Sequence, residues 1–535
     1  LAQVESPARR GSARAAMDFD EIASDAPEWA QAINGFLLND EGTKAMDAAR
    51  EAFVGAVRRG DTRGKVIALL AIAKVHLCRR ELNDAREVAE KALAELVQAP
   101  DDKLEGAVMH LLAKVSRDLY QFQDALELAQ EAAGIFQKAG SKAGEGAVLD
   151  TIAKINLKKD RKQDALKFAK QALAMFRACE ERDGEAEALR TLARAHAAVK
   201  KHSDALRSAN EAVGVYEGGP EVDRHAAALL LVAEIRAGMG EHEDAVETVT
   251  RVVELYENRD RSKQAAATRR LADACFAKGD DSDGWMYAKE ALELYRQQGD
   301  LRGEAAVLCE IALAHFVTGT FQEGVYIAEE GVRICREQGY RDQLAAILVA
   351  AGRARLDQEA TGAAQDLSLN WQARVAAKEA LAIYEDTGNL YGQMKALNTL
   401  ALAFMAYGNV LEGRAKAKRA VELSQMCGDK AAEGANLLLV AQSRTHDNRD
   451  EAVRLANLAQ KLLKDGGDKA ALGELEEILE QIREPEKQKK AEKERKGGTT
   501  LAENMADKMD LTMDMDFMKT RAVYFWGFVS RETRR

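Results

Sequence analysis

The sequence predicts an all-α protein: a right-handed solenoid of about eleven helix-turn-helix repeats, with a C-terminal cap helix and a flexible tail. The first observation is a register that recurs about every forty residues through most of the chain. The second is composition, because the chain is rich in Ala, is 5% aromatic and has five prolines, which favours long helices. The third is length, because one compact core rarely accommodates 535 residues, whereas stacked repeats bury their apolar faces against their neighbours.

The register consists of a polar, usually acidic, residue followed by Ala or Gly, and usually by a large apolar residue twelve positions after the polar one. Most copies are spaced by 40 residues; two spacings are 39 and one is 49. Self-similarity of this kind indicates stacked supersecondary units. The copies begin at Lys44, Asp84, Asp124, Asp164, Asp204, Asp244, Asp283, Glu323, Gln372, Glu412 and Glu451.

Each unit is predicted to contain two helices, as residues 145–180 illustrate. Apolar residues from Val148 to Ile155 follow a helical period, a polar KKDRKQ turn follows, and a second apolar stripe runs from Ala165 to Phe176. Small residues recur where the two helices would cross, because a larger side chain there would overpack the crossing at a cost of roughly 1–3 kcal/mol. They are Ala73, Ala113, Ala153, Ala193, Ala233, Ala272, Ala312 and Ala401 in the first helix, and Ala85, Ala125, Ala165, Ala205, Ala245, Gly284, Gly324 and Gly413 in the second.

The turns between units carry Gly followed by Asp or Asn, as in Gly299-Asp300 and Gly388-Asn389. Gly ends a helix in the left-handed conformation, and the short polar side chain caps the next helix.

This pattern resembles the tetratricopeptide repeat (TPR). The small residue at the family's eighth position corresponds to Ala153, and the Ala residues at its twentieth and twenty-seventh positions correspond to Ala165 and Ala172. The forty-residue period and the linker from Gly299 to Glu304 are similar to the long-repeat branch, which includes Partner-of-Inscuteable adaptors and kinesin light chains. The resemblance covers about residues 27–484 and implies a superhelix whose first helices line a concave, partner-binding face.

The chain also departs from the TPR pattern. The Leu-Gly-Asn signature of the Partner-of-Inscuteable branch is absent, and Ala stands at the aromatic twenty-fourth position. The family Tyr at the eleventh position is replaced in the first five full repeats by His76, Ser116, Asn156, His196 and Arg236.

The array is predicted to occupy residues 17–484, with an atypical first repeat at 27–58 and a Glu-rich cap helix at 469–484. Residues 1–16 are rich in Arg, Ala and Ser, and three interpretations compete: translated upstream sequence, the remnant of a transit peptide, or a disordered arm. The 49-residue spacing places an insertion between Arg355 and Trp371, which we expect to be a loop extension.

Beyond Pro485 the composition changes. Residues 485–500 are predicted to form a charged linker, and residues 501–535 a tail that is first Met-rich and then aromatic and basic. The aromatic part, from Tyr524 to Phe528, lies beside several arginines. This suits docking on a membrane surface, in a partner's groove or in the chain's own groove, and a truncated or misread terminus is a further alternative. Five methionines are separated by acids before it, namely Met505, Met509, Met513, Met515 and Met518.

The sequence contains no signature that predicts an enzyme, a metal site or a cofactor. The turn from Gly140 to Gly146 has the composition of a phosphate-binding loop but lacks its spacing and follows a helix rather than a strand. The eight histidines are dispersed, and no Cys/His set has zinc spacing. The six cysteines contain no CxxC pair, so we expect them to pack as small apolar residues in a reducing, cytoplasmic compartment.

The bulk charge and hydropathy exclude further classes. A net charge of −11 argues against general nucleic-acid binding. No apolar run approaches the roughly 20 residues of a membrane span.

A basic column is predicted on the concave face. By the TPR register the ninth position of the first helix points into the groove, and four successive repeats place Lys or Arg there. Such a column favours an extended acidic peptide, a phosphopeptide or a C-terminal carboxylate. We expect Lys114 and Lys154 to be exposed, so that reversing their charge would abolish binding without unfolding the array. The candidate groove residues are Lys74, Lys114, Lys154 and Arg194, with His110 and Arg190 at the neighbouring fifth position.

The predicted function is therefore a non-enzymatic scaffold or adaptor that holds peptide segments of other proteins. The alternative is a regulatory or sensor module in which residues 519–535 act as an autoinhibitory plug. The TPR chaperone ligand clamp is not supported, because it needs Lys and Asn where this chain has Leu70 and Lys74.

Overall fold

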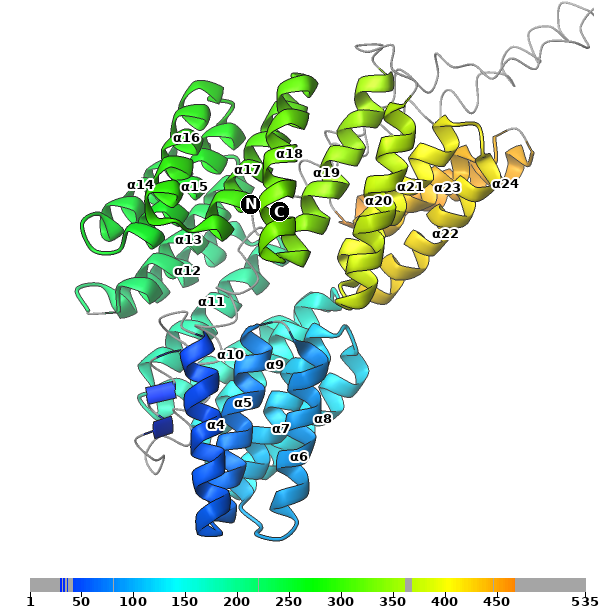
Figure 1. The fold of residues 1–535 in the computed structure, drawn as a ribbon. Coiled ribbons are helices and arrows are strands. Elements are labelled where there is room, and N and C mark those ends of the chain that lie inside the picture. The colour runs from blue at the N-terminus through cyan, green and yellow to red at the C-terminus, as the bar shows by residue number, and fades with distance from the viewer. Residues whose placement is uncertain are drawn as a thin grey trace, which may run out of the picture. The chain divides into compact units, whose positions relative to one another are not determined.

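A computed structural model describes residues 29–30, 32–33, 36, 42–79, 81–219, 221–360, 368–445 and 447–466. These residues form 21 helices and no strand, which confirms the all-α prediction for the part of the chain described. The chain divides into two compact units, Leu1–Leu294 and Tyr295–Arg535. In each unit, consecutive helices pair as antiparallel hairpins (Figure 1).

Ten complete helix pairs follow α4 (Gly42–Arg59), which is the second helix of the atypical first repeat. The first helices are α5 (Thr62–Cys78), α7 (Asp102–Asp118), α9 (Lys142–Lys158), α11 (Arg182–Ala198), α13 (Val222–Met239), α15 (Arg261–Lys278), α17 (Leu301–Val317), α19 (Arg341–Ala360), α21 (Leu390–Ala406) and α23 (Lys430–Gln442). The second helices are α6 (Leu82–Leu96), α8 (Phe122–Lys138), α10 (Lys162–Ala178), α12 (His202–Tyr216), α14 (His242–Tyr256), α16 (Asp281–Gln298), α18 (Phe321–Gln338), α20 (Leu369–Asp386), α22 (Val410–Cys427) and α24 (Arg449–Gly466).

The forty-residue register is confirmed in every copy. Its polar residue is the third or fourth residue of a second helix, from Lys44 in α4 to Glu451 in α24. The small residues of the register are buried as predicted; Ala153 and Ala165, for example, are fully inaccessible to solvent. The repeats are thus TPR-like, because small side chains let the two helices of each hairpin approach closely.

The first helices form the inner layer of each unit. Besides its own hairpin partner, α9 contacts both α7 and α11, and α19 contacts both α17 and α21. Among the described residues, successive second helices make no comparable contact with one another. The layer of first helices is therefore the narrower side of the stack, as in a TPR array.

Turns between repeats have the predicted chemistry. Gly299 has a φ of 64°, in the left-handed region that a Cβ disfavours, and ends α16. Asp300 then caps α17, because its carboxylate accepts a hydrogen bond from the Gly303 amide at 2.9 Å.

The predicted insertion is only partly a loop. Helix α19 has 20 residues, against 17 or 18 in the preceding first helices, so two or three of the nine extra residues lengthen this helix. The helical propensity of the Ala-, Glu- and Gln-containing segment after Arg355 accounts for the longer helix. Most of the extra sequence lies between the end of α19 at Ala360 and the start of α20 at Leu369. Residues 361–367, the predicted cap helix at 469–484, the linker, the tail and residues 1–16 lie outside the described residues.

Candidate functional site

The predicted groove residues lie on contiguous helices of the inner layer. Lys74, Lys114, Lys154 and Arg194 occupy equivalent positions on α5, α7, α9 and α11, and each of these helices contacts the next. The register prediction therefore places the four cations on one layer of the first unit. Their environments differ from one another.

Lys154 lies at the centre of a charge cluster. Its Nζ forms an ion pair with Asp150, one turn earlier on α9, and lies 2.7 Å from Glu187 Oε1 on α11. Glu187 Oε2 in turn accepts a hydrogen bond from Arg190 Nη1 at 2.8 Å. The side chains are 13% exposed for Lys154, 7% for Asp150 and 8% for Glu187, so these charges interact in a partly desolvated setting.

The prediction that the Lys154 side chain is exposed was wrong. The prediction that Lys74 points into the groove was also wrong. Lys74 is 1% exposed, because α5 is packed against α4, α6 and α7. Lys154 is covered in the same way by neighbouring helices and is held by two acids. Lys114 and Arg194 are half-buried, and they offer more accessible charge than Lys74.

His110 is a structural residue. It is 2% exposed, and its Nε2 lies 2.8 Å from Thr151 Oγ1 on the next first helix. The contact joins α7 to α9 in the layer that carries the cations. His110 therefore positions the column rather than presenting a ligand-binding surface.

The two acids of the cluster were missed in the sequence. Asp150 has the same register phase as His110 and Arg190 and lies four residues before Lys154, a spacing that forms ion pairs on helices. That spacing was a usable signal. Glu187 lies 33 residues after Lys154, a separation that identifies a partner only once the packing of α9 on α11 is known.

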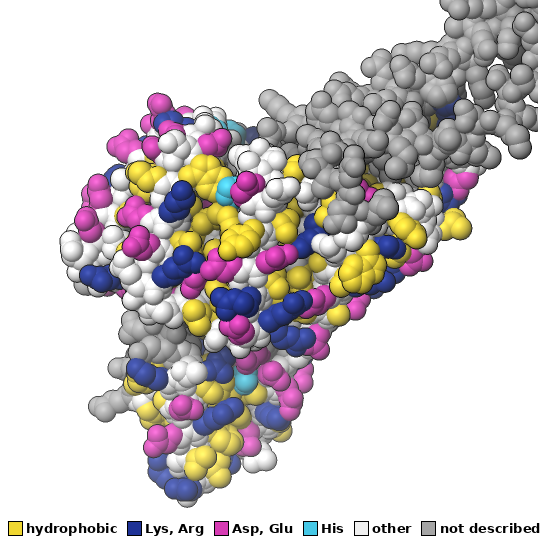
Figure 2. All heavy atoms as spheres, turned by 45° about the horizontal axis from the view of Figure 1, so that its top comes forward, with side chains coloured by type: hydrophobic (Ala, Val, Ile, Leu, Met, Phe, Trp, Pro, Cys, Tyr) yellow, Lys and Arg dark blue, Asp and Glu magenta, His cyan; other side chains and the backbone are white. Residues whose placement is uncertain are grey.

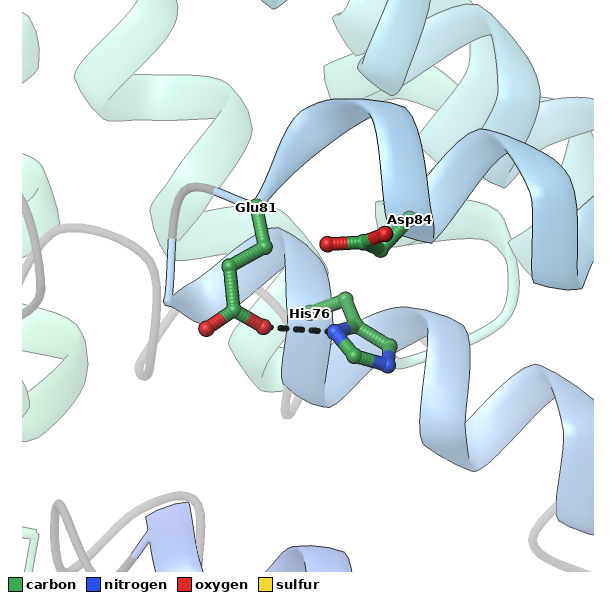
Figure 3. A group of neighbouring side chains, drawn as sticks. All are labelled: His76, Glu81 and Asp84. Carbon is green, nitrogen blue, oxygen red and sulfur yellow. Dashed lines mark hydrogen bonds and ion pairs between the residues drawn. The ribbon is translucent and has the colours of Figure 1, made fainter. Parts of the chain in front are cut away.

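A second cluster lies at a hairpin turn. His76 at the end of α5, Glu81 in the turn and Asp84 on α6 point toward one another, with ligand atoms within 4.8 Å (Figure 3). His76 Nδ1 lies 2.6 Å from Glu81 Oε2. The acids are exposed, and no metal prediction was made for them.

Other repeats show what this turn cluster does. His315 has the same phase as His76, and its Nδ1 lies 2.7 Å from Thr320 Oγ1, where Glu81 stands in the earlier repeat. A hydroxyl is a poor metal ligand beside a lone imidazole, so the conserved geometry within this chain is a polar contact between the first helix and the turn. We interpret His76–Glu81 as the same structural contact.

Two ionisable residues are buried together in the second unit. Arg353 and Asp357 on α19 are 4% and 1% exposed, and Arg353 Nε lies 3.3 Å from Asp357 Oδ1. Burial raises the pKa of Asp357 to about 7, although the nearby guanidinium acts in the opposite direction. Four of the six free cysteines are buried, which confirms the packing prediction for them, whereas Cys309 is half-buried and Cys179 is exposed, so the prediction was wrong for Cys179. Burial raises the pKa of Cys275 and Cys335 to about 11.

The described surface carries mixed charge. Figure 2 shows a face on which basic and acidic side chains are interspersed, so recognition by charge depends on local clusters. An open depression at the turns from Asp160 to Asp164 and from Ala198 to Lys200 is lined mainly by charged and polar side chains. None of the described helices has the length and apolar character needed to cross a membrane.

No family model and no curated protein sequence matches this chain. Solved structures that resemble it are helical-repeat proteins. A Rap protein in complex with competence and sporulation factor has a TM-score of 0.42 and 15% identity, covering 76% of this chain and 99% of that one. The quorum sensor NprR from B. thuringiensis, in its apo form, has a TM-score of 0.40 and 14% identity, with the same coverage. A Podospora anserina array of nearly identical, kinesin light chain TPR-like repeats has a TM-score of 0.32 and 19% identity, covering 36% and 95%. At these identities the likeness concerns the helical-repeat fold alone.

Proposed function

We propose that this chain is a non-enzymatic protein-binding scaffold or adaptor whose inner layer holds acidic peptide segments of partner proteins. The observation that carries the proposal is the cation cluster on α7, α9 and α11. Asp150 and Glu187 join Lys154 and Arg190 in one cluster, and Lys114 and Arg194 are half-buried on the first helices α7 and α11 on either side of α9.

The acids of the cluster organise it for binding. Asp150 and Glu187 fix Lys154, and Glu187 also fixes Arg190, so these side chains lose little conformational freedom when a ligand binds. Arg194 forms no ion pair with any described residue, and its planar guanidinium suits bidentate contact with a carboxylate or phosphate. Such contacts set register and association rate, and they weaken as salt rises.

The test reverses charge at the accessible positions. Lys114→Glu/Arg194→Glu is preferable to a variant that includes Lys154, because a third acid beside Asp150 and Glu187 would perturb folding. The matched control is Lys138→Glu/Lys170→Glu, which makes the same charge change at exposed positions of the second helices α8 and α10.

Binding is measured by fluorescence anisotropy with a labelled Glu-rich peptide and its Gln-rich counterpart, followed by affinity capture from lysate. We expect the wild-type chain and the control to bind the Glu-rich peptide and the inner-layer variant to lose at least about tenfold in affinity, or roughly 1.4 kcal/mol. Equal binding by both variants would remove the inner layer as the site. Catalytic turnover that survives purification and is lost with one inner-layer substitution would overturn the non-enzymatic assignment.

The adaptor role, the cytoplasmic location and the preference for acidic or phosphorylated segments belong to this proposal. The alternative of an autoinhibited regulatory module depends on residues 519–535, which lie outside the described residues.

A further inference from the structure

The second unit exposes four large apolar side chains on or next to helices that pack consecutively, α20, α21 and α22. Trp371 and Val375 on α20, Tyr407 in the turn before α22, and Leu411 on α22 are 60%, 43%, 65% and 74% exposed. We call these four residues the α20–α22 patch. Single exposed apolar residues are common, but a group of four that includes Trp and Tyr is typical of an interaction site.

The repeat register shows that this exposure is specific to two repeats. Trp371 and Leu411 share one phase, the residue immediately before the register's polar residue. Every other full repeat has a polar residue at this solvent-facing position, namely Asn83, Gln123, Gln163, Ser203, Glu243, Ser282, Gln322 and Asp450. The fold therefore does not require an apolar side chain there, and packing within the repeat does not explain Trp371 or Leu411.

Cations accompany the patch. Trp371, Arg374, Val375 and Lys378 are spaced i, i+3, i+4 and i+7, so they share one face of α20. The Arg374 guanidinium carbon lies 4.4 Å from the centroid of the Tyr407 ring, and Lys378 Nζ lies 5.8 Å from that of Phe404. The described residues provide neither cation with a carboxylate at ion-pair distance, although the Glu359 carboxylate interacts electrostatically with Arg374.

The chemistry of the patch selects its ligand. Aromatic rings favour contact with methionine sulfur and other flexible apolar groups, and cations beside them favour carboxylates. A complementary segment is amphipathic, with apolar side chains on one side and acids on the other, as in helices that bind apolar surfaces.

The chain itself contains such a segment. In residues 501–518, LAENMADKMDLTMDMDFM, an apolar residue recurs every four positions at Leu501, Met505, Met509, Met513 and Phe517. Five acids and one lysine give the segment a net charge of −4. We propose that residues 501–518 bind the α20–α22 patch of the same chain, with their methionines against Trp371 and Tyr407 and their carboxylates near Arg374 and Lys378.

The covalent connection favours binding within one chain. Residue 501 follows Gly466, the end of α24, by 35 residues, and α24 is two repeats from α20. Helices α20 to α24 pack consecutively, and packed helices lie about 10 Å apart, so the required span is at most on the order of 40 Å. This connection contains the predicted cap helix at 469–484, which would span about 24 Å, and the predicted charged linker at 485–500, whose root-mean-square extension as a flexible chain is about 22 Å. A connection of this reach favours binding within one chain over binding between chains. The proposal does not depend on ligand binding by the inner layer of the first unit.

The experiment replaces Trp371 with the photoreactive residue benzoylphenylalanine in the full chain. The matched control carries the same residue at Gln163, which is exposed and has the same register phase in a repeat without the patch. Equal amounts of isotopically heavy and light protein are mixed before irradiation, and cross-linked peptides are identified by mass spectrometry. We expect position 371 to cross-link to residues 501–518 within one isotopic form, and position 163 not to do so.

A second variant tests the chemistry of the contact. Met505→Asp/Met509→Asp in the chain carrying the probe at position 371 should reduce the cross-linked yield about tenfold, because it places charge against the aromatic patch. Cross-links only between heavy and light chains would assign the patch to a second copy and overturn the proposal. It would also be overturned by equal yields at positions 371 and 163, by an unchanged yield in the Met variant, or by cross-links that avoid residues 501–518.

Discussion

Lys154 Nζ lies 2.7 Å from Glu187 Oε1, and this ion pair joins the first helices of two successive repeats. Asp150 pairs with the same ammonium group, so Lys154 interacts with two carboxylates that are each less than one-tenth exposed, and Arg190 supplies the second positive charge to Glu187. Lys154, which the sequence analysis predicted to face solvent in the groove, is thus part of the interface between two repeats.

Replacing this lysine should therefore destabilise the array. We expect Lys154→Glu to cost about 3–5 kcal/mol, because it leaves three acids together in a partly desolvated site, and Lys154→Met to cost less. Hydrogen exchange of the α9 and α11 amides measures the effect locally, which suits a repeat array. The exposed reversal Lys170→Glu is the control; equal exchange in both Glu variants would contradict the structural role of Lys154.

The glycines at the register position match bulky partners on the first helix. A Cβ on Gly284 would lie 2.6 Å from the Phe276 ring, and one on Gly413 would lie 2.6 Å from Met405 Cγ. Where Ala stands at this position in the first five full repeats, the residue equivalent to Phe276 is Leu, Arg or Ala. We expect Gly284→Ala to cost roughly 1–3 kcal/mol by overpacking.

The Phe276→Leu background provides the decisive comparison. There, Gly284→Ala should cost much less, as measured by thermal unfolding and hydrogen exchange of α15 and α16. If Gly284→Ala cost the same in the wild-type and Phe276→Leu backgrounds, Phe276 would not be the cause of the overpacking.

Gly134→Ala is the matched control, because the added Cβ at this helical glycine meets nothing within 4 Å, and it should stabilise α8 by roughly 0.5–1 kcal/mol.

Hairpin turns place a left-handed residue at one fixed phase. Lys200 has a φ of 62° there, whereas the next repeat has Gly240 with a φ of 85°. Because a side chain disfavours this conformation, we expect Lys200→Gly to stabilise the first unit by about 0.5–1 kcal/mol and Gly240→Ala to destabilise it by a similar amount. Asp160, with a φ of 56°, should gain less from the same change, since Asp tolerates the left-handed region better than Lys. Thermal unfolding of the three variants tests this order.

The sequence predicted those features of the fold that depend on residues close together in the chain. The register identified the second helix of every repeat, because helical periodicity, small crossing residues and Gly–Asp turns act within a few residues of one another. It did not predict the burial of Lys74 or the Lys154–Glu187 ion pair. The burial depends on how α4, α6 and α7 pack around α5, and the ion pair joins residues 33 positions apart on α9 and α11. Side chains at one register phase share a position on the helix, but not the same neighbours from adjacent repeats.

The buried Asp357 should make the stability of the second unit depend on pH. Its pKa is raised from 3.8 to about 7, so the folded chain binds a proton that the unfolded chain releases between these values. Stability should therefore fall as pH rises from about 4 to about 7, by an amount on the order of 4 kcal/mol at 1.4 kcal/mol per pKa unit. The side chain introduced by Asp357→Asn cannot ionise. This variant should therefore show a weaker pH dependence of the free energy of unfolding, and it should be more stable than the wild-type chain at pH 8. Asp386→Asn, at an exposed carboxylate, should leave the slope unchanged. Chemical denaturation at several pH values measures both variants, and an undiminished slope in Asp357→Asn would show that a group other than Asp357 causes the pH dependence.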